Sequence, residues 1–333
     1  EYSPLIRSNR MKDRFSSHHG VLIVNKPPGP SSHDMVYRLR SLLGIQKIGH
    51  AGTLDPFASG VLVMGVGQGT KILEYLQHQK KTYRMVLRLG LITDTYDCNG
   101  QVVEEREVRF CPEAIREAAS AFVGGYAQVP PVYSAKKVQG QRLYDLARKG
   151  KIIRMPPKNV EIDRIDVLSI QGADVTLEVV AGEGTYMRSL AMDIGYRLGT
   201  GATALSLVRL KSGAFTIEGA LELWEQSSKE LLIQSLLPIE TALSDFKRIY
   251  LSEADVLKVR NGNQVYAFFP TTGPAGMYSD LSFEKDELLL ACEQTGKPVA
   301  VLRAEVNGSF AASLANRSLN RRIATLVKVF GVM

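Results

Sequence analysis

The chain has 333 residues, 45% hydrophobic and 23% charged, with 41 Lys and Arg against 34 acids. This composition excludes a wholly disordered chain, and the longest apolar run, near Val61–Val66, is too short to span a membrane. The three cysteines are too few for a disulfide framework or a zinc knuckle. Since Glu1–Gly20 lacks a signal-peptide pattern, we expect a cytoplasmic, reduced protein without a structural metal.

The N-terminal half opens with a clear strand and a clear helix. Gly20–Asn25 is a branched apolar run that ends at a lysine and three prolines, which predicts a strand and a rigid turn. Ser31 and Ser32 precede a helical pattern over Met35–Leu43, with Asp34 near its start. The next predictions, in chain order, are a loop over Gly49–Ala58, a strand over Val61–Gly67, a helix over Thr70–Gln77, a strand over Thr82–Leu89 and a helix over Pro112–Phe122.

The second half is dominated by strands. Those before residue 240 are expected over Val160–Ile170, Val175–Val180 and Ala204–Leu210, with a helix over Thr185–Leu198. Short strands beyond residue 246 are expected over Leu288–Ala291, Val299–Ala304 and Ile323–Phe330. Because no regular βαβ rhythm appears, we predict an α+β fold built on a mixed sheet.

One segment carries the whole excess charge. Ser134–Lys158 contains eight bases and one acid, which accounts for the net charge of +7. A solvated charged face would explain the pattern. The neighbouring prolines and tyrosines (Pro130, Pro131, Tyr133, Tyr144) instead favour a loop that binds a polyanion with bases that can stack. We therefore predict a basic insertion at about 130–158 that contacts RNA through Lys136, Lys137, Arg148 and Lys149.

Motifs for several other activities fail on spacing. Gly65–Gly69 lacks the dinucleotide fingerprint, and Gly150-Lys151 is followed by Ile152 instead of Ser or Thr. Ser31–His33 has no nucleophile-elbow glycine, and the five histidines include no zincin spacing. The sequence thus gives no support for nucleotide hydrolysis, serine hydrolysis or metal catalysis, and we expect no metal or nucleotide cofactor.

The stretch Gly49–Gly60 holds the candidate nucleophile, Asp55. An Asp before Pro is often only a helix N-cap. Here the glycines let the loop approach a ligand, His50 lies five residues upstream, and an apolar strand follows as a rigid base. A carboxylate that an arginine keeps ionised could act as a nucleophile.

At these residues the sequence resembles the TruB-type pseudouridine-55 tRNA synthases. Gly49–Leu62 is similar to the family's GHxGxLDPxAxGVL, with Asp55 in the place of the nucleophile and Ala51 and Phe57 where Thr and Leu are common. The other similar stretches are Lys26–Ser32 (KPxGxTS, with Ser31 for Thr), Lys81–Tyr83 (KxY), Thr93–Gly100 (TDTxDxxG), Pro130–Ala135 with Tyr144–Arg148 (this branch's insertion), Gly184–Arg188 (GTYIR) and Leu207–Arg209 (LRR, interrupted by Val208). The resemblance covers nearly all of residues 20–333.

The resemblance implies an isomerase that flips uridine 55 out of the tRNA T-loop, breaks its N1–C1′ bond and rejoins the uracil through C5. Asp55 would be the nucleophile, and Arg188 would pair with it. Tyr83 would stack on the flipped base and take part in proton transfer at C5. The implied substrate contacts are His50 in the space left by the flipped base, Leu207 beneath the uracil, Lys26 and Tyr186.

The same resemblance implies the domain organisation. We expect a flexible N-terminal extension over 1–19, a catalytic domain over 20–245 and a small β-rich PUA-like RNA-binding domain over 246–333. The last expectation rests on Leu251–Gly262 and Ala324–Val329. The expected partner of this monomer is the T-arm stem-loop of tRNA. Two alternatives stay open, namely a guide-dependent relative that modifies ribosomal RNA and a non-catalytic RNA-binding or RNA-folding protein.

Overall fold

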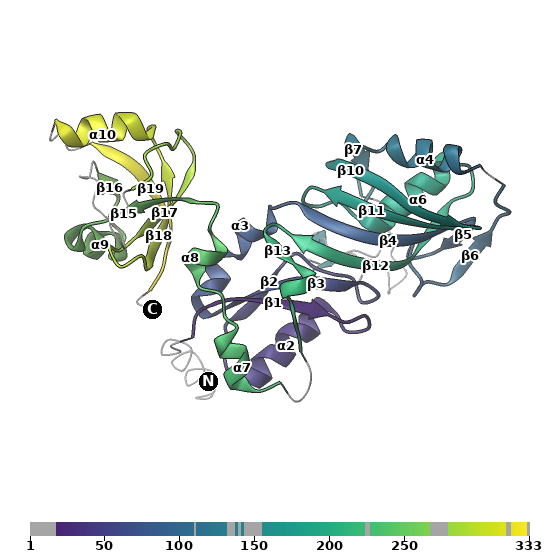
Figure 1. Cartoon of the computed structure of the whole chain (residues 1–333), viewed down its shortest axis with the longest axis horizontal. Coiled ribbons are helices and arrows are strands. Elements are labelled where there is room, and N and C mark those ends of the chain that lie inside the picture. The colour runs from purple at the N-terminus through teal and green to yellow at the C-terminus, as the bar shows by residue number, and fades with distance from the viewer. Residues whose placement is uncertain are drawn as a thin grey trace.

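The structure is a computed structural model that describes residues 18–109, 111–131, 137–138, 141–142, 155–223, 227–266, 279–317 and 321–331. Its larger sheet has ten strands in the order β14–β1–β3–β12–β4–β11–β10–β7, with β13 paired to β12 and β2 to β3 (Figure 1). The strands are β1 (Gly20–Lys26), β2 (Ile48–Ala51), β3 (Ser59–Val66), β4 (Lys81–Leu89), β7 (Gly124–Gln128), β10 (Lys158–Gln171), β11 (Asp174–Ala181), β12 (Ala202–Ser212), β13 (Phe215–Thr216) and β14 (Leu221–Glu222).

The sheet is mixed, as the sequence predicts. β1 pairs with β14 and β3 with β12 in parallel, and the other neighbours are antiparallel. Two short antiparallel pairs lie outside it, β5 (Leu91–Thr93) with β6 (Val102–Glu105) and β8 (Lys137–Val138) with β9 (Gln141–Arg142).

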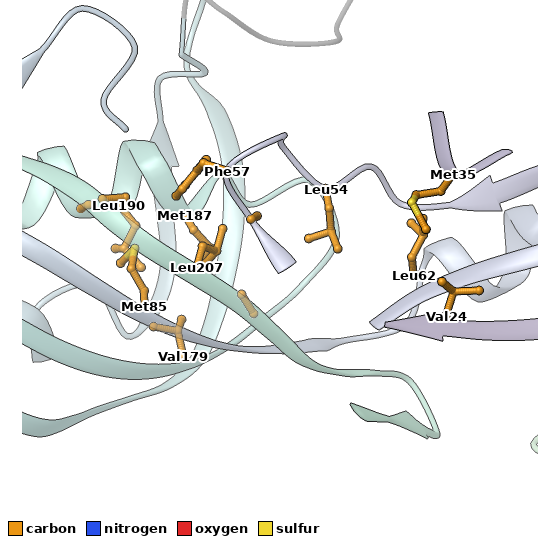
Figure 2. Packing of buried hydrophobic residues seen from close by; sticks show 14 of the residues in the cluster. Val24, Met35, Leu54, Phe57, Leu62, Met85, Val179, Met187, Leu190 and Leu207 are labelled. Atoms are coloured by element: carbon orange, nitrogen blue, oxygen red, sulfur yellow. The ribbon is translucent and has the colours of Figure 1, made fainter. Parts of the chain in front are cut away.

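β1 and β3 are buried on both faces, which explains their unbroken apolar sequences. Leu22 and Val24 face a core shared with helix α2 (Ser32–Leu43), while Val21 and Ile23 face a second core. In the first core, Figure 2 shows Leu207 grouped with Met85 and Met187 near Phe57.

Helices cover the sheet where the sequence places them, with shifted ends. Ser31 caps α2 in a capping box with Asp34, as a serine followed three residues later by an acid predicts. α4 (Pro112–Ser120) packs on β10, and α6 (Met187–Arg197) packs on β12. The other helices among the described residues are α3 (Leu73–Gln77), α7 (Lys229–Gln234), α8 (Ile239–Ala242), α9 (Glu253–Arg260) and α10 (Gly308–Asn316), with 3₁₀ turns at Gly67–Ile72 and Ile217–Gly219.

Two local predictions need correction. The loop predicted over Gly49–Ala58 begins as strand β2, because Ile48–Ala51 pairs with the edge of β3. The helix predicted over Thr70–Gln77 starts as a 3₁₀ turn and becomes α-helical only at Leu73. A Cβ at Gly69 would lie 1.9 Å from the carbonyl oxygen of Gly20, so this turn packs directly on β1.

A smaller sheet forms the C-terminal unit, drawn in green to yellow in Figure 1. Its order is β15 (Lys247–Tyr250), β17 (Leu288–Cys292), β18 (Pro298–Ala304), β19 (Arg322–Val329) and β16 (Val265–Tyr266). The three strands predicted beyond residue 280 are confirmed. Tyr250, Leu290 and Phe330 join the second core beneath β1 and β3, so one hydrophobic cluster spans both sheets.

Candidate active site

The loop that carries Asp55 is held by the turn after β1. The Ser32 hydroxyl accepts the Leu54 N–H at 2.8 Å and donates to the Leu54 carbonyl at 3.0 Å, and Ser32 is 1% exposed. Lys26 Nζ donates to the carbonyls of Pro27 (2.9 Å), Pro30 (2.7 Å) and Pro56 (3.3 Å). Burial lowers the pKa of Lys26 to about 8, against the opposing pull of Asp55. Lys26 thus ties the proline-rich turn to the Asp55 loop.

Asp55 and Arg188 form a two-point ion pair. Arg188 Nε lies 2.8 Å from Asp55 Oδ2, and Nη2 lies 3.0 Å from Oδ1. The arginine side chain is 4% exposed and the carboxylate 33% exposed. Such a fork fixes the plane and the orientation of a carboxylate. The pairing expected from the resemblance is therefore present, with the carboxylate open to the adjoining cavity.

A second acidic residue holds the far side of Arg188. Its Nη1 donates to the Thr95 carbonyl at 2.9 Å and lies 3.3 Å from Asp97 Oδ2. Asp97 is 6% exposed and also accepts the Thr95 hydroxyl (2.7 Å) and the Asn99 N–H (3.0 Å). Arg188 is thus bonded on both sides and has little freedom to turn away from Asp55.

A cavity of about 220 Å³ opens beside this pair. Asp55, Tyr83, Tyr186, Arg188 and Leu207 all line it, so five of the predicted site residues meet at one place. Tyr83 on β4 lies opposite Arg209 on β12, and Leu207 lies opposite Met85. Leu207 is 5% exposed and packs in the first core, which gives the cavity a fixed apolar floor.

Two buried cations line the same cavity, although no sequence pattern had assigned them a role. Lys81 donates to the carbonyls of Gln77 and Gln79, the latter at 2.6 Å. Burial, with Arg209 nearby, lowers the pKa of Lys81 to about 8. Arg209 donates to the carbonyls of Val61 (2.6 Å) and Gly52 (3.0 Å) and is 1% exposed. Lys81 lies in the stretch Lys81–Tyr83 and Arg209 in the stretch Leu207–Arg209. Their place in these two family-like stretches is the only sequence signal that points to them.

His50 lies on β2, outside the lining of this cavity. Burial, followed by the charge of Arg209, lowers its pKa to about 4. Among the described residues, its buried Nδ1 atom has no hydrogen-bond partner. With the lowered pKa the ring is neutral near pH 7.

The predicted RNA contacts of the insertion fall outside the part that can be described in detail. Lys136, Arg148 and Lys149 lie outside the described residues, and Lys137 is known only as a backbone position in β8.

Among the described residues, no three His, Cys, Asp or Glu side chains are grouped to hold a metal ion. None of the described helices is long and apolar enough to cross a membrane.

Comparison with known proteins decides the family. The family described as TruB family pseudouridylate synthase (N terminal domain) matches residues 40–187. A tRNA pseudouridine synthase B from Thermotoga maritima is 46% identical over 94% of this chain and 98% of its own length. The chain belongs to the TruB family. It is accordingly a pseudouridine synthase, an isomerase.

Other TruB relatives and solved structures agree with this assignment. The tRNA pseudouridine synthase B of Thermosipho melanesiensis is 45% identical over 93% of this chain and 98% of its own length. A chain of a Cbf5–Nop10–Gar1 complex aligns with TM-score 0.70 and 25% identity, covering 99% of this chain and 89% of that one. An archaeal box H/ACA Nop10–Cbf5 complex gives TM-score 0.69 at 24% identity, covering 96% and 88%. The fold is therefore shared, over nearly the whole chain, with these two solved structures.

Proposed function

We propose that this TruB-family enzyme converts uridine 55 in the T-loop of tRNA to pseudouridine, with Asp55 as its nucleophile. The observation that carries the proposal is the Arg188 fork, which holds a 33% exposed carboxylate at the edge of a cavity. Relatives covering nearly the whole chain are tRNA pseudouridine synthases B, which supports tRNA as the substrate.

The chemistry needs a carboxylate that is ionised, oriented and open on one side. Attack by Asp55, at C1′ or on the uracil ring, allows the N1–C1′ bond to break. The ring then turns and bonds to C1′ through C5, and the bond to Asp55 breaks as the product forms, which restores the carboxylate. The C5 hydrogen is lost and N1 gains a proton, so no electrons leave the system. Arg188 pairs with the carboxylate and holds it in plane, and Tyr83 faces the same cavity for stacking and proton transfer.

The other candidate residues receive more limited roles. Leu207 would support the uracil from the apolar floor of the cavity, with Tyr186 at its wall. We assign Lys26 to holding the Asp55 loop, because its three carbonyl contacts point into the turn. His50, as a neutral ring outside the cavity, would occupy the space that the flipped base leaves in the RNA.

RNA binding beyond the cavity is assigned to two further regions. The insertion at about 130–158 would clamp the T-arm through its phosphates. The chain would divide into an N-terminal extension over 1–19, a catalytic domain over 20–245 and a PUA-like RNA-binding domain from residue 246. The chain would act as a monomer. Replacing Lys136, Lys137, Arg148 and Lys149 by Ala should weaken T-arm binding more than about tenfold and flatten its salt dependence.

The decisive experiment uses the bare chain and an isolated T-arm stem-loop labelled with tritium at C5 of its uridines. Isomerisation releases the label, because C5 exchanges its hydrogen for the glycosidic bond. Release from position 55 alone supports the proposal. Release only when a guide RNA and partner proteins are added would favour the guide-dependent alternative, and binding without release would favour an RNA-binding protein.

A further inference from the structure

The far end of strand β7 is bonded to the helix that carries Arg188. Gln128, the last residue of β7, is 1% exposed. Its Oε1 accepts the backbone N–H of Tyr186 at 2.7 Å, and its Nε2 donates to the Tyr186 carbonyl at 3.1 Å. One side-chain amide therefore holds both backbone polar groups of a residue 58 positions away.

Tyr186 is the position from which α6 starts. It is the N-cap of that helix, and its side chain makes no capping hydrogen bond. Met187 is the first helical residue and Arg188 the second. A shift of the Tyr186 backbone would thus be passed on to the guanidinium that holds Asp55, across only two residues.

Two further contacts reinforce this junction. The Ser189 hydroxyl donates to the Val129 carbonyl at 2.8 Å, and Ser189 is 2% exposed. The second N–H of the Gln128 amide donates to the Tyr126 hydroxyl, which lies 3.4 Å from Asp193 Oδ2 on α6. All polar atoms of the Gln128 amide are thereby used, and the bonds to Tyr186 fix which way the amide faces.

We propose that Gln128 is a positioning residue for the reaction, which sets the start of α6 and through it the orientation of Arg188 against Asp55. This inference rests on the proposed role of the Asp55–Arg188 pair. It goes further, because it assigns a function to a buried amide that lines no part of the cavity. Gln128 also lies directly before the basic insertion in the chain, and it pairs with Lys158, at the other end of the insertion, where β7 meets β10.

The first test compares Gln128→Met with Thr200→Val. Methionine has a similar shape but cannot make the two bonds to Tyr186. Thr200 is 5% exposed and bonds backbone carbonyls near the opposite end of α6, at Gly201 (3.0 Å) and Gly195 (3.4 Å), so its variant loses buried hydrogen bonds away from Arg188. Single-turnover tritium release at saturating T-arm RNA, RNA affinity and thermal unfolding are measured for each.

Gln128→Met should slow single turnover about 10- to 100-fold, as misplacement of a reacting group by a fraction of an ångström does. RNA affinity should stay within about threefold, since the residue touches no RNA in the proposed complex. Thr200→Val should lower the unfolding temperature without slowing single turnover. If both variants slow turnover equally, or neither does, Gln128 is only a structural residue and the inference is wrong.

Gln128→Glu keeps the proposal testable if the methionine variant does not fold. In this variant an ionised carboxylate can accept from the Tyr186 N–H but cannot donate to its carbonyl, whereas the protonated acid can do both. Burial raises the pKa of such a carboxyl. Tyr126 bonds to the amide of Gln128 and lies beside Asp193. Lys158 is opposite Gln128 on β10, and Arg188 is two residues beyond Tyr186, so wild type is measured over the same range to remove the titration of these groups.

The ratio of the Gln128→Glu rate to the wild-type rate should rise as pH falls from about 8 to about 6, the range expected for a buried acid. A ratio that does not change with pH would overturn the inference. The outcome is separable from that of the proposed function: if Asp55→Asn keeps its activity, the nucleophile assignment fails, whereas an inactive Asp55→Asn with unaffected Gln128 variants removes only the present inference.

Discussion

The molecule contains the same two-point arginine–aspartate pair in two different settings. At the cavity, Arg188 holds Asp55 at 2.8 and 3.0 Å, and on the sheet surface Arg88 holds Asp174 at 2.6 and 2.8 Å. The carboxylates are equally exposed, at 33% and 32%, but Arg188 is 4% exposed and Arg88 is 47% exposed. The geometry of the fork is therefore not what distinguishes a site from a surface contact. The difference lies in the burial of the arginine and in its further bonds to Thr95 and Asp97.

The largest expected difference between the two pairs is in catalysis. Asp55→Asn keeps the shape of the side chain but removes the nucleophile, so single-turnover tritium release should fall more than about 100-fold while T-arm affinity stays within a few-fold. Asp174→Asn breaks the equivalent surface fork and should leave the rate unchanged. Equal rates in the two variants would show that Asp55 is no more than another paired carboxylate.

Arg188→Lys should have the next largest effect. A lysine keeps the charge, but its single ammonium cannot replace all the contacts that the guanidinium makes with Asp55, the Thr95 carbonyl and Asp97. We expect the maximal rate to fall about 30- to 100-fold, with little change in RNA affinity. Arg88→Lys is the matched control and should behave as wild type. A loss of affinity with an unchanged maximal rate would place Arg188 in RNA binding instead.

The sequence predicted one side of the buried pair much better than the other. Asp55 was found because its loop, its glycines and the turn that holds it are short local patterns. Lys26 at the end of β1 and Ser32 at the start of α2 flank that turn and are close to Asp55 in the sequence. The supports of Arg188 come from Asp97, in the Thr93–Gly100 stretch, and from Gln128. Both lie tens of residues away from Arg188, so no local pattern pairs them with it. Sheet order, the start of β2 and the docking of the C-terminal unit also depend on such long-range contacts.

A smaller effect should follow from loosening the Asp55 loop while leaving the pair intact. Ser32→Ala leaves the N–H and carbonyl of Leu54 buried without their side-chain partner, which should cost about 1–3 kcal/mol of unfolding free energy. The maximal rate should also fall several-fold, because Asp55 is the next residue. Ser120→Ala removes an exposed hydroxyl bonded to a carbonyl of α4 and serves as control. Chemical denaturation measures both, and equal stabilities would show that the Ser32 contacts are dispensable.

The smallest effect is expected at the surface pair itself. Arg88→Ala should destabilise the protein slightly at low salt and not measurably at high salt, because salt screens an exposed pair. The hydrogen bond from Arg88 lowers the pKa of Asp174 below the ordinary range of an aspartate. The contribution of this pair is therefore complete above that ordinary range and is lost as pH falls through the lowered pKa of the folded state. The unfolding temperatures of wild type and variant should differ at pH 7 and become equal in acid. A difference that persists in acid would contradict this account.

The continuous core beneath β1 and β3 has a consequence for how the protein comes apart. Val21, Ile23 and Val63 on the larger sheet share that core with Tyr250 and Phe330 of the C-terminal unit. Lys71 adds a bond to the Val329 carbonyl (2.6 Å), and Lys328 pairs with Glu74 (2.7 Å). A chain truncated near residue 245 would lose Tyr250, Leu290 and Phe330 from this core, which would expose part of one face of β1 and β3, and it should aggregate. Calorimetry of the whole chain should show one cooperative transition, and amides of β1 and β19 should exchange hydrogen together.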